Sequence, residues 1–512
     1  MYHKLLNYNV NPAFVRLLRN IYKHSSLAVK TQSGRSSIFA SNVGLKQGCN
    51  LSPLLFKLFI NDFLTEVSMS FTHSPHLEDT PVNALMYADD LVLISKSENG
   101  LQNLLDILHR FTESWFLQVN KSKTKCMQFS RSRTPTSRNF NFGDNILEVT
   151  DQYCYLGTVF SKNGSLNEAG RVLHDKAQKA MYGLLGRVNK HKTCDPKLLL
   201  SLFDKMIFPI ASYNSEVWGT MCFPQNPRNN DFLNISINRS PIEDIQTRFC
   251  KRILRVSDKA TNWAVLSECG RLPTIIQVIC KIVGFWHHII QSPSPILQAA
   301  LRTNGNLASS GVKCWFFYFK RCLKFLDIEH ILYTTDTKEV HLKVGRVKKI
   351  LLAKAQSNWD LQHSKLKGPP SSKLDLYSKI KSSFGYSNFL SAPISSESKA
   401  DICKMRISAH NLPVETDRYS NIPRQLRICP LCCRGVGNES HYITECSFPR
   451  FSSLRETFFK SISTLSTDFP KMNASEQAVF LLSSANNVIL SKMGKFSTAI
   501  RKCFREIRSN KK

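Results

Sequence analysis

Residues 83–95 read NALMYADDLVLIS, in which two adjacent carboxylates, Asp89 and Asp90, stand between the apolar runs 85–88 and 91–94. Short apolar runs without Gly or Pro are typical of buried strands. The pattern therefore predicts a tight hairpin with the Asp pair at its tip. Asp is common in solvated turns, so a purely structural turn is one interpretation. Two like charges repel, however, and a divalent metal would offset that repulsion, so metal binding is the other.

The charge of the whole chain narrows the class of partner. Its 512 residues are enough for two or three domains with hydrophobic cores. The chain has 69 Lys and Arg against 38 Asp and Glu, a net charge of +31, which is usually tolerated where a polyanion is the partner. A membrane surface would require a concentrated amphipathic anchor or a lipidation signal, whereas here the charge is spread along the whole length. Nucleic acid is therefore the predicted partner, without membrane contact.

The apolar segments and the cysteines indicate the compartment. The first residues, MYHKLLN, become polar before an apolar segment forms, so we expect no secretory signal. The stretch 274–290 is interrupted by Gln277, Lys281 and His287, which predicts a buried helix rather than a membrane span. The 16 cysteines lack the density of a secreted disulfide scaffold. We predict an intracellular, reduced chain, plausibly in the nucleus, in which close Cys/His clusters indicate zinc.

The first third of the chain predicts alternating helices and short strands. Residues 1–66 look helical at both ends with a strand-like middle. Ser52 followed by Pro53 favours a helix with Ser52 as its N-cap, running through LLFKLFINDFLTE. After the hairpin, residues 101–116 carry apolar side chains at helical spacing. Helix, hairpin, helix and strand in this order predict an α+β domain.

Two basic helices are predicted further along. Residues 166–188 have an apolar face, and in residues 240–256 Ser240 and Glu243 have the spacing of a capping box. The apolar positions of the second helix are Ile242, Ile245, Phe249 and Ile253. Its cations are Arg248, Lys251, Arg252 and Arg255. Such a run is often only a solvated face, but the basicity of the chain makes contact with backbone phosphates an equal alternative.

Other segments give weaker signals. Residues 131–138, RSRTPTSR, predict a solvated connector, with a localisation patch as the alternative. Residues 364–373 and 388–399 are typical of linkers or loops, and little distinguishes the rest of 291–395. The C-terminal segment begins at about residue 396 and ends in a basic helix, FSTAIRKCFREIRSNKK.

The C-terminal segment contains a Cys/His cluster, CPLCCRGVGNESHYITEC. Cys429, Cys432, His441 and Cys446 have the spacing C-x2-C…H-x4-C, which fits a small Cys₃His zinc site. Unrelated thiols and a core histidine are the structural alternative. Cys433 can replace Cys432 in the pattern, and the sequence does not choose between them.

Three further motifs accompany the Asp pair. GLKQGCNLSPLLF (44–56) precedes it, while NKSKTK (120–125) and YLG (155–157) follow. Taken singly these motifs are weak, since a G-x-x-x-G is often only a turn and a lysine cluster is often only surface.

Taken in order, the motifs resemble those of the reverse transcriptases of non-LTR (LINE-type) retrotransposons. The resemblance continues through FPIASYNSEVWG (208–219) and IEDIQTRFCKRILRVS (242–257) into the Cys/His cluster. It implies an RNA-directed DNA polymerase with a right-hand palm, here partial, and a helical thumb. It also implies a C-terminal helical region that holds a zinc-knuckle-like module and binds nucleic acid.

The resemblance assigns a role to each motif. Asp89 and Asp90 would hold Mg²⁺ in two-metal nucleotidyl transfer, in which the ions lie about 3.5–4 Å apart, and Lys123 would protonate or steady the pyrophosphate. The implied contacts to template, primer and nucleotide are Gly44, Gln47, Gly48, Tyr87, Tyr155, Leu156 and Gly157. The implied partners are an RNA template, a DNA primer or target DNA, and dNTPs, and the implied cofactors are Mg²⁺ and Zn²⁺.

The chain departs from the family in one respect. Family polymerases supply a further metal-binding Asp from a strand upstream of the GLKQG motif, but here no Asp or Glu precedes Asp62. We therefore expect that the chain begins partway through a polymerase domain and is catalytically incomplete. The alternative is a non-catalytic RNA- or DNA-binding protein that retains the thumb and the zinc module.

The expected domains follow from these motifs. They are a partial palm (1–130), the palm end and thumb (131–260), a helical connector (261–395) and the zinc-knuckle-like region (396–512).

Overall fold

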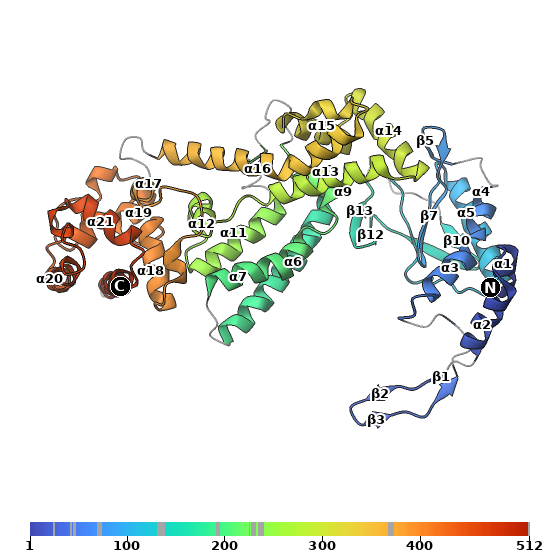
Figure 1. Ribbon diagram of the computed structural model, residues 1–512, viewed down its shortest axis with the longest axis horizontal. Coiled ribbons are helices and arrows are strands. Elements are labelled where there is room, and N and C mark those ends of the chain that lie inside the picture. Colours follow the sequence, from blue (N-terminus) through green and yellow to red (C-terminus); the bar gives the residue numbers. More distant parts are fainter. Residues whose placement is uncertain are drawn as a thin grey trace. The chain divides into compact units, whose positions relative to one another are not determined.

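The computed structural model describes residues 1–23, 26–40, 44, 48–68, 74–130, 139–190, 195–224, 226, 232–233, 240–366 and 373–509. The chain divides into two compact units, whose elements Figure 1 labels. Unit 1 comprises Met1–Cys154, Ser161–Gly164 and Ser292–Asn306, and unit 2 comprises Tyr155–Phe160, Ser165–Gln291 and Leu307–Lys512. The chain is a mixed, mainly helical protein with few strands. The predicted connector 131–138 lies outside the described residues.

Unit 1 combines short strands with helices, as the sequence predicts for its first third. Its helices are α1 (Tyr2–Asn7), α2 (Pro12–Lys23), α3 (Ser52–Ile60), α4 (Asp62–Ser68), α5 (Glu98–Ser114) and most of α14 (Pro295–Ser309). Its strands are β1 (Ser26–Leu27), β2 (Lys30–Thr31), β3 (Gly34–Arg35), β4 (Phe39–Ala40), β5 (His76–Leu77), β6 (Thr80–Pro81), β7 (Ala84–Tyr87), β8 (Asp90–Leu93), β9 (Lys125–Cys126), β10 (Phe140–Phe142) and β11 (Asn145–Val149). Strands β10, β11 and β9 form a three-stranded sheet, and the others named here pair in twos.

The predicted hairpin is present as the antiparallel pair β7–β8. The inner sides of the two strands, including Met86 and Leu91, pack against the core that α4 and α5 form around Phe63 and Phe111. The strands were predicted to be buried, but they are only half-buried: Leu85 and Tyr87 are exposed on the other side. A two-stranded ribbon has one face for the core and one for solvent, so an unbroken apolar run does not imply burial on both faces.

The helix that was predicted to have Ser52 as its N-cap differs from that prediction at its start and in its middle. Ser52 is the first helical residue and Leu51 is the N-cap, while the Ser52 hydroxyl lies 2.8 Å from the Tyr22 hydroxyl. The predicted single helix is also broken at Asn61 into α3 and α4. A tertiary hydrogen bond therefore uses the side chain that the sequence pattern assigned to the cap.

Among its described residues, unit 2 is helical apart from the short strand β13 (Thr158–Ser161), most of which it contains. Its α-helices are α6 (Asn167–Lys190), α7 (Pro196–Leu202), α8 (Phe208–Ala211), α9 (Ser215–Trp218), α11 (Pro241–Leu254), α12 (Asn262–Glu268), α13 (Ile275–Gln291), α15 (Trp315–Phe325), α16 (Thr337–Lys365), α17 (Asp375–Ile380), α18 (Ser396–Arg406), α19 (Pro413–Thr416), α20 (Pro449–Ser463), α21 (Ala474–Ser483) and α22 (Asn487–Ser509). The loops predicted for 388–399 are partly helical, because a 3₁₀ turn occupies Asn388–Ser391 and α18 begins at Ser396.

The apolar stretch 274–290 forms the buried helix that the sequence predicts. Helix α13 buries most of its apolar side chains, among them Val278, Ile279 and Ile282. Among the described helices, none has the length and apolar character needed to cross a membrane.

Helix α11 begins at Pro241, but the predicted capping box at its start does not form. Glu243 is fully buried and accepts hydrogen bonds of 2.6 Å from both the backbone N–H and the hydroxyl of Thr274. The Ser240 hydroxyl points to the Cys222 sulfur instead, at 3.5 Å. The prediction was wrong because Glu243 joins α11 to the start of α13, which is a contact between segments distant in sequence.

A buried ion pair connects distant helices of unit 2. The Arg406 guanidinium of α18 donates two hydrogen bonds of 3.0 Å to the Glu268 carboxylate of α12, and it also donates to the Leu482 carbonyl of α21. Burial alone would raise the pKa of Glu268, but the Arg406 charge and its hydrogen bonds hold that pKa below its usual range. The carboxylate is therefore ionised when the unit is folded.

Replacing Glu268→Gln should lower the free energy of unfolding by about 3–5 kcal/mol, because it leaves a buried guanidinium without its counter-charge. The control Glu506→Gln, which removes an exposed partner of Arg450, should cost no more than about 1 kcal/mol. Because the folded-state pKa of Glu268 is depressed, its contribution is present above the ordinary pKa of about 4.3 and declines as the pH falls below it. Urea unfolding at neutral and acidic pH would measure both effects, and equal losses for the two variants would contradict this account.

Candidate functional site

The Asp pair lies at an exposed hairpin tip. Tyr87 and Asp90 are paired across the ribbon, so Ala88 and Asp89 form the turn between them. Ala88 has a φ of 55°, which is uncommon for a residue with a Cβ. Both carboxylates are exposed, and 65% of the Tyr87 side chain is accessible beside them. The core thus fixes the base of the ribbon while the tip presents two anions to solvent.

No third ligand accompanies the pair in the part of the chain that the structure describes. Over that part, the single group of three or more His, Cys, Asp or Glu side chains whose ligand atoms come together is the Cys/His cluster of unit 2. The nearest preceding acidic residue in the sequence, Asp79, lies in the turn of a different hairpin, β5–β6. Asp62 faces Lys4 at 2.7 Å.

The glycine and lysine motifs also lie in unit 1. Gly44 and Gly48 have φ values of 91° and 80°, in a region that favours glycine, and both are open to solvent. Gln47 lies outside the described residues. Lys123 is exposed in the turn after α5, and its carbonyl accepts a hydrogen bond from the Tyr153 hydroxyl at 3.3 Å.

The YLG motif forms the tight turn between β12 (Gln152–Tyr155) and β13, and the boundary between the units runs through this hairpin. Leu156 and Gly157 both have positive φ, 47° and 79°. The Tyr213 hydroxyl donates to the Leu156 carbonyl at 3.1 Å, and a Cβ at Gly157 would come within 2.8 Å of the Tyr213 ring. Glycine is therefore required there for two reasons, its φ and its contact.

A second contact also joins this turn to residues 212–214. The Asn214 side-chain amide donates to the Thr158 hydroxyl at 2.8 Å. Two segments 56–57 residues apart, the YLG turn and residues 212–214, thus support one another within unit 2.

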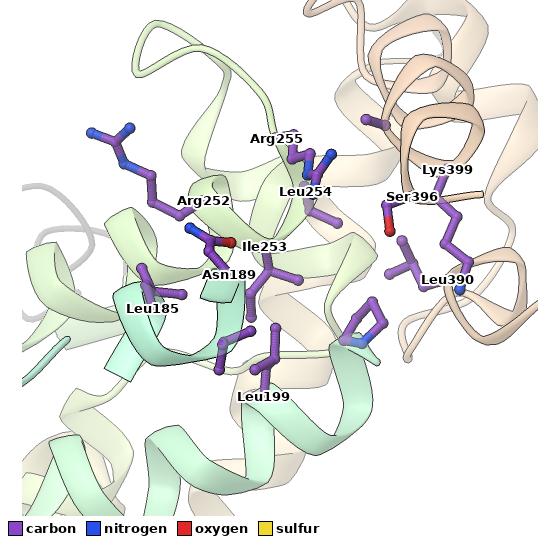
Figure 2. Close-up of a pocket in the computed structure, with 13 residues that line it drawn as sticks. Leu185, Asn189, Leu199, Arg252, Ile253, Leu254, Arg255, Leu390, Ser396 and Lys399 are labelled. Carbon is purple, nitrogen blue, oxygen red and sulfur yellow. The ribbon is translucent and has the colours of Figure 1, made fainter. Parts of the chain in front are cut away.

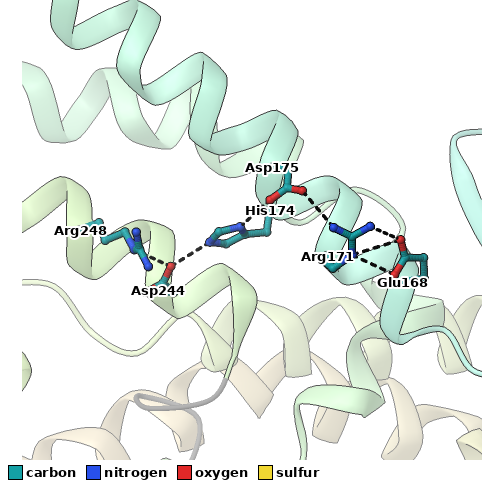
Figure 3. Close-up of polar contacts among 6 residues, drawn as sticks. All are labelled: Glu168, Arg171, His174, Asp175, Asp244 and Arg248. Carbon is teal, nitrogen blue, oxygen red and sulfur yellow. Dashed lines mark hydrogen bonds and ion pairs between the residues drawn. The ribbon is translucent and has the colours of Figure 1, made fainter.

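Helix α11 uses part of its charge internally (Figure 3). Arg248 donates from Nε to Asp244 Oδ2 at 2.7 Å, and His174 Nε2 of α6 lies 2.8 Å from the same oxygen. On α6, Asp175 lies near His174 and also faces Arg171, which pairs with Glu168. Asp244 therefore joins α11 to α6 through His174, and Arg248 is paired with Asp244 within α11 and is not a free cation.

Lys251 was predicted to lie on the positive surface of α11, and this prediction is wrong. Its side chain is buried, and its ammonium group donates to the Asp258 carbonyl at 2.6 Å. Burial lowers the pKa of Lys251. The chain turns back after α11, at Arg255 with a φ of 53°, and so covers a position that would be exposed on an isolated helix.

Arg252, in the last turn of α11, and Arg255, just after the helix, are also exposed (Figure 2). They lie at the edge of a cavity of about 50 Å³ whose lining is mostly apolar and includes Leu185, Leu199 and Ile253. Ligand pockets are typically about 300–1,000 Å³, so this cavity is too small for a nucleotide. Ile253, predicted to be buried, is half-buried, and Leu254 is buried instead.

The Cys/His cluster is assembled around a short π-helical turn, His441–Glu445. The ligand atoms of Cys429, Cys432, His441 and Cys446 all lie within 4.8 Å of one another. The Cys429 and Cys446 sulfurs are 3.8 Å apart, and Cys432 Sγ is 3.2 Å from His441 Nε2. Zn–S bonds of about 2.3 Å in a tetrahedron place sulfurs about 3.8 Å apart, so these four donors fit a metal ion of that kind.

Cys433 is exposed and does not belong to this group. It has a φ of 54° in the turn between Cys432 and Gly435, and its N–H donates to the Cys429 carbonyl at 2.9 Å. Of the two cysteines that the sequence left open, it is therefore Cys432 whose sulfur lies with the other three donors in the structure.

The protonation of the cluster is consistent with a metal site. Burial lowers the pKa of His441, which favours the neutral imidazole that metals bind. Burial raises the pKa of Cys446 to about 12, so without a cation that thiol keeps its proton. The pKa of Cys432 is lowered: burial opposes ionisation, but hydrogen bonds to the sulfur outweigh it.

Two residues around the cluster were missed by the sequence analysis. The Arg455 guanidinium is buried and donates to the carbonyls of Ile443 at 3.0 Å and Cys446 at 2.9 Å, which fixes the ligand loop. The Tyr442 hydroxyl is buried without a hydrogen-bond partner among the described residues. Burial, followed by the neighbouring Cys429 sulfur, raises the pKa of Tyr442. A thiolate held by a metal would accept a hydrogen bond from such a hydroxyl.

Comparison with known proteins shows what the first third of the chain is similar to. Residues 2–160, which contain the hairpin, the lysine motif and the YLG turn, match the family described as reverse transcriptase (RNA-dependent DNA polymerase). The chain therefore contains a reverse transcriptase region.

The relatives define the type. The chain is 28% identical over 172 residues to the retrovirus-related Pol polyprotein from type-2 retrotransposable element R2DM of Drosophila melanogaster, covering 32% of this chain and 16% of the relative. It is 24% identical over 218 residues to the RNA-directed DNA polymerase from mobile element jockey of the same species, covering 41% and 23%. The family match and these relatives support a LINE-type, non-LTR reverse transcriptase region in this chain, which spans less than a quarter of the length of these two relatives.

Lys251→Ala should lower the free energy of unfolding by about 1.5–3 kcal/mol, because it removes a hydrogen bond from a charged, buried group. Arg252→Ala, one position along on the exposed side, should change it by no more than about 0.5 kcal/mol. Thermal or urea unfolding of the two variants would measure the difference, and a Lys251→Ala variant as stable as Arg252→Ala would refute the assignment.

Proposed function

We propose that the chain acts in RNA-directed DNA synthesis, with Asp89 and Asp90 as the ligands of Mg²⁺. The observation that carries the proposal is the exposed YADD hairpin tip, mounted on the core of unit 1 within the region 2–160 that matches the reverse transcriptase family. The proposed partners are an RNA template, a DNA primer or target DNA, and dNTPs.

Each motif has a proposed role in this function. Mg²⁺, when bound, would activate the primer hydroxyl and stabilise the leaving pyrophosphate. Asp89, in the turn, is the principal ligand and Asp90 the weaker one, while Lys123 steadies the pyrophosphate. The residues proposed to contact template, primer and nucleotide are Gly44, Gln47, Gly48, Tyr87, Tyr155, Leu156 and Gly157. The rigid turn at Leu156, braced by Tyr213, suits a part that positions a primer end.

The domain assignment remains part of the proposal. Residues 1–130 would form a partial palm, 131–260 its end and the thumb, 261–395 a helical connector, and 396–512 the zinc-knuckle-like region. The packing of α6 against α11 through the Arg248–Asp244–His174 contacts supports a helical thumb.

The site of the 512-residue chain is proposed to be catalytically incomplete. Two adjacent carboxylates can recruit Mg²⁺, but placing both ions for in-line attack needs a ligand from another strand. No Asp or Glu precedes Asp62, and among the described residues no third carboxylate joins the pair. The same observation favours a second candidate function, a non-catalytic RNA- or DNA-binding protein.

The 512-residue chain should therefore extend a DNA primer on an RNA template little or not at all. A longer polypeptide that adds an upstream strand with its Asp should restore synthesis. In that polypeptide Asp89→Ala should reduce extension by at least about 100-fold, because it removes a metal ligand. The matched control is Asp79→Ala, an exposed Asp in the turn of another hairpin, which should leave extension unchanged. Robust extension by the 512-residue chain that is lost in Asp89→Ala would show that its site is already complete.

The second part of the proposal concerns zinc. Cys429, Cys432, His441 and Cys446 are proposed to hold one zinc ion, which would fix the loop between α19 and α20 for contact with nucleic acid. The support is the closeness of the four donors, the neutral imidazole and the buried Tyr442 hydroxyl beside the Cys429 sulfur.

The purified, reduced chain should contain about one zinc ion, as expected for a closed four-ligand site. Cys432→Ser should lose the metal, whereas the matched variant Cys433→Ser should retain it, because Cys433 lies outside the group. Metal analysis by atomic emission, with thiol titration before and after chelation, would measure this. A chain without zinc would remove the module, and loss from Cys433→Ser alone would reverse the ligand assignment.

A further inference from the structure

Helix α16 carries a concentration of positive charge that no sequence motif indicated. It spans 29 residues, Thr337–Lys365, and buries Val340, Val347 and Leu351 along one side. From position 340 to position 359 the sequence has no Asp or Glu, but it has five Lys and Arg residues. These cations are Lys343, Arg346, Lys348, Lys349 and Lys354.

The helix is held firmly by its buried side. It packs along α13, and Trp359 stacks on Trp263 with ring centroids 5.7 Å apart. The Trp359 indole N–H donates to the Ser267 hydroxyl at 2.9 Å. At the other end, the Asp336 carboxylate caps the helix by accepting from the Lys338 N–H at 2.9 Å. The remaining side of α16 is therefore a fixed surface rather than a mobile arm.

Four of the five cations are not used within the fold. Lys354 pairs with Asp327 at 2.8 Å. Throughout the described ranges, no acidic side chain lies within ion-pair distance of Lys343, Arg346, Lys348 or Lys349. Arg346, Lys348 and Lys349 are exposed, and Lys343 is partly exposed. Helix α11 differs in this respect, because its Arg248 is paired and its Lys251 is buried.

We infer that the solvent side of α16 is a docking surface for the phosphate backbone of a nucleic acid. Lys343, Arg346 and Lys349, called here the α16 cluster, recur every three residues and so follow one side of the helix, whereas Lys348 points about 160° away from Arg346. The three extend along about 9 Å of the helix, a length over which duplex DNA carries about five phosphate charges. Uncompensated Lys and Arg on a rigid helix give contact without reading base sequence. The inference rests on the proposed function for the identity of the polyanion, and it adds a binding surface that the family motifs do not include.

A membrane surface fits these observations less well. A helix that lies on a lipid surface needs its exposed apolar side chains on one stripe. The exposed leucines of α16 are Leu342, Leu352 and Leu361. Leu352 and Leu361 are nine residues apart and so lie on opposite sides of the helix, and the three together form no single stripe. The apolar stripe that α16 does have is already buried in the fold.

The test compares two variants with the same change of charge. The first carries Lys343→Ala, Arg346→Ala and Lys349→Ala. The control carries Lys197→Ala, Lys205→Ala and Lys460→Ala, three exposed lysines on other helical segments of unit 2. Alanine maintains helix propensity, and circular dichroism with thermal unfolding would verify that both variants fold. The full chain would be titrated onto a labelled DNA duplex of about 20 base pairs, by fluorescence anisotropy over a range of salt concentrations.

Loss of three phosphate contacts should make the slope of log affinity against log salt shallower by about 2–3 in the α16 variant, and the control variant should change it much less. Equal slopes and affinities for the two variants would overturn the inference while leaving the proposed function intact, provided that the unmodified chain binds the duplex. No binding by the unmodified chain would count against the proposed function itself. A variant that lost binding to anionic vesicles or to an acidic peptide but kept its duplex binding would also overturn the inference.

Discussion

Electrostatic repulsion between Asp89 and Asp90 is the constraint around which the candidate site is built. Adjacent carboxylates are tolerated only in water or beside a cation, so the turn that carries them has to project from the protein. The β7–β8 ribbon meets this requirement by placing Met86 and Leu91 against the core of α4 and α5, and by leaving Tyr87 and the turn exposed. The same packing that orders the base of the hairpin holds the two carboxylates of the tip in a fixed position.

Some of the Lys and Arg side chains that give the net charge of +31 are paired inside the fold, and others face solvent. Arg406 and Arg455 are buried, one against Glu268 and the other against backbone carbonyls of the ligand loop, so they stabilise the fold and cannot reach a phosphate. The α16 cluster has no such partner within the described residues, and it is fixed by the opposite side of its helix. A count of Lys and Arg thus indicates a polyanionic partner, but the internal ion pairs and hydrogen bonds decide which cations remain available to bind it. Only these available cations contribute to the salt dependence of binding.

Local patterns predicted much of the fold. The hairpin, α5, α6, α11 and α13 occur where spacing and turn residues indicated them, because each depends mainly on contacts within about ten residues. The predicted basic C-terminal helix is also present as α22, but it begins earlier, at Asn487. The errors have one cause. Ser52 and Glu243 have capping side chains that the structure uses in hydrogen bonds to Tyr22 and Thr274, and Lys251 is covered by the chain that follows α11. In each case the side chain contacts, or is covered by, a segment outside the local pattern. The local pattern carries no information about such a contact.

The sequence by itself determined the chemistry: adjacent carboxylates between apolar runs, three cysteines and a histidine at metal-binding spacing, and an excess of positive charge. These follow from residue types and short spacings, which are complete in the linear chain. Tertiary structure alone decided which of two adjacent cysteines joins Cys429, His441 and Cys446, since a positive φ turns Cys433 outward and leaves Cys432 3.2 Å from the imidazole. It also decided which cations face solvent, and that Tyr213 supports the YLG turn from about 57 residues away. The orientation of distant segments and the distances between them are set by tertiary packing, which exists only in the folded chain.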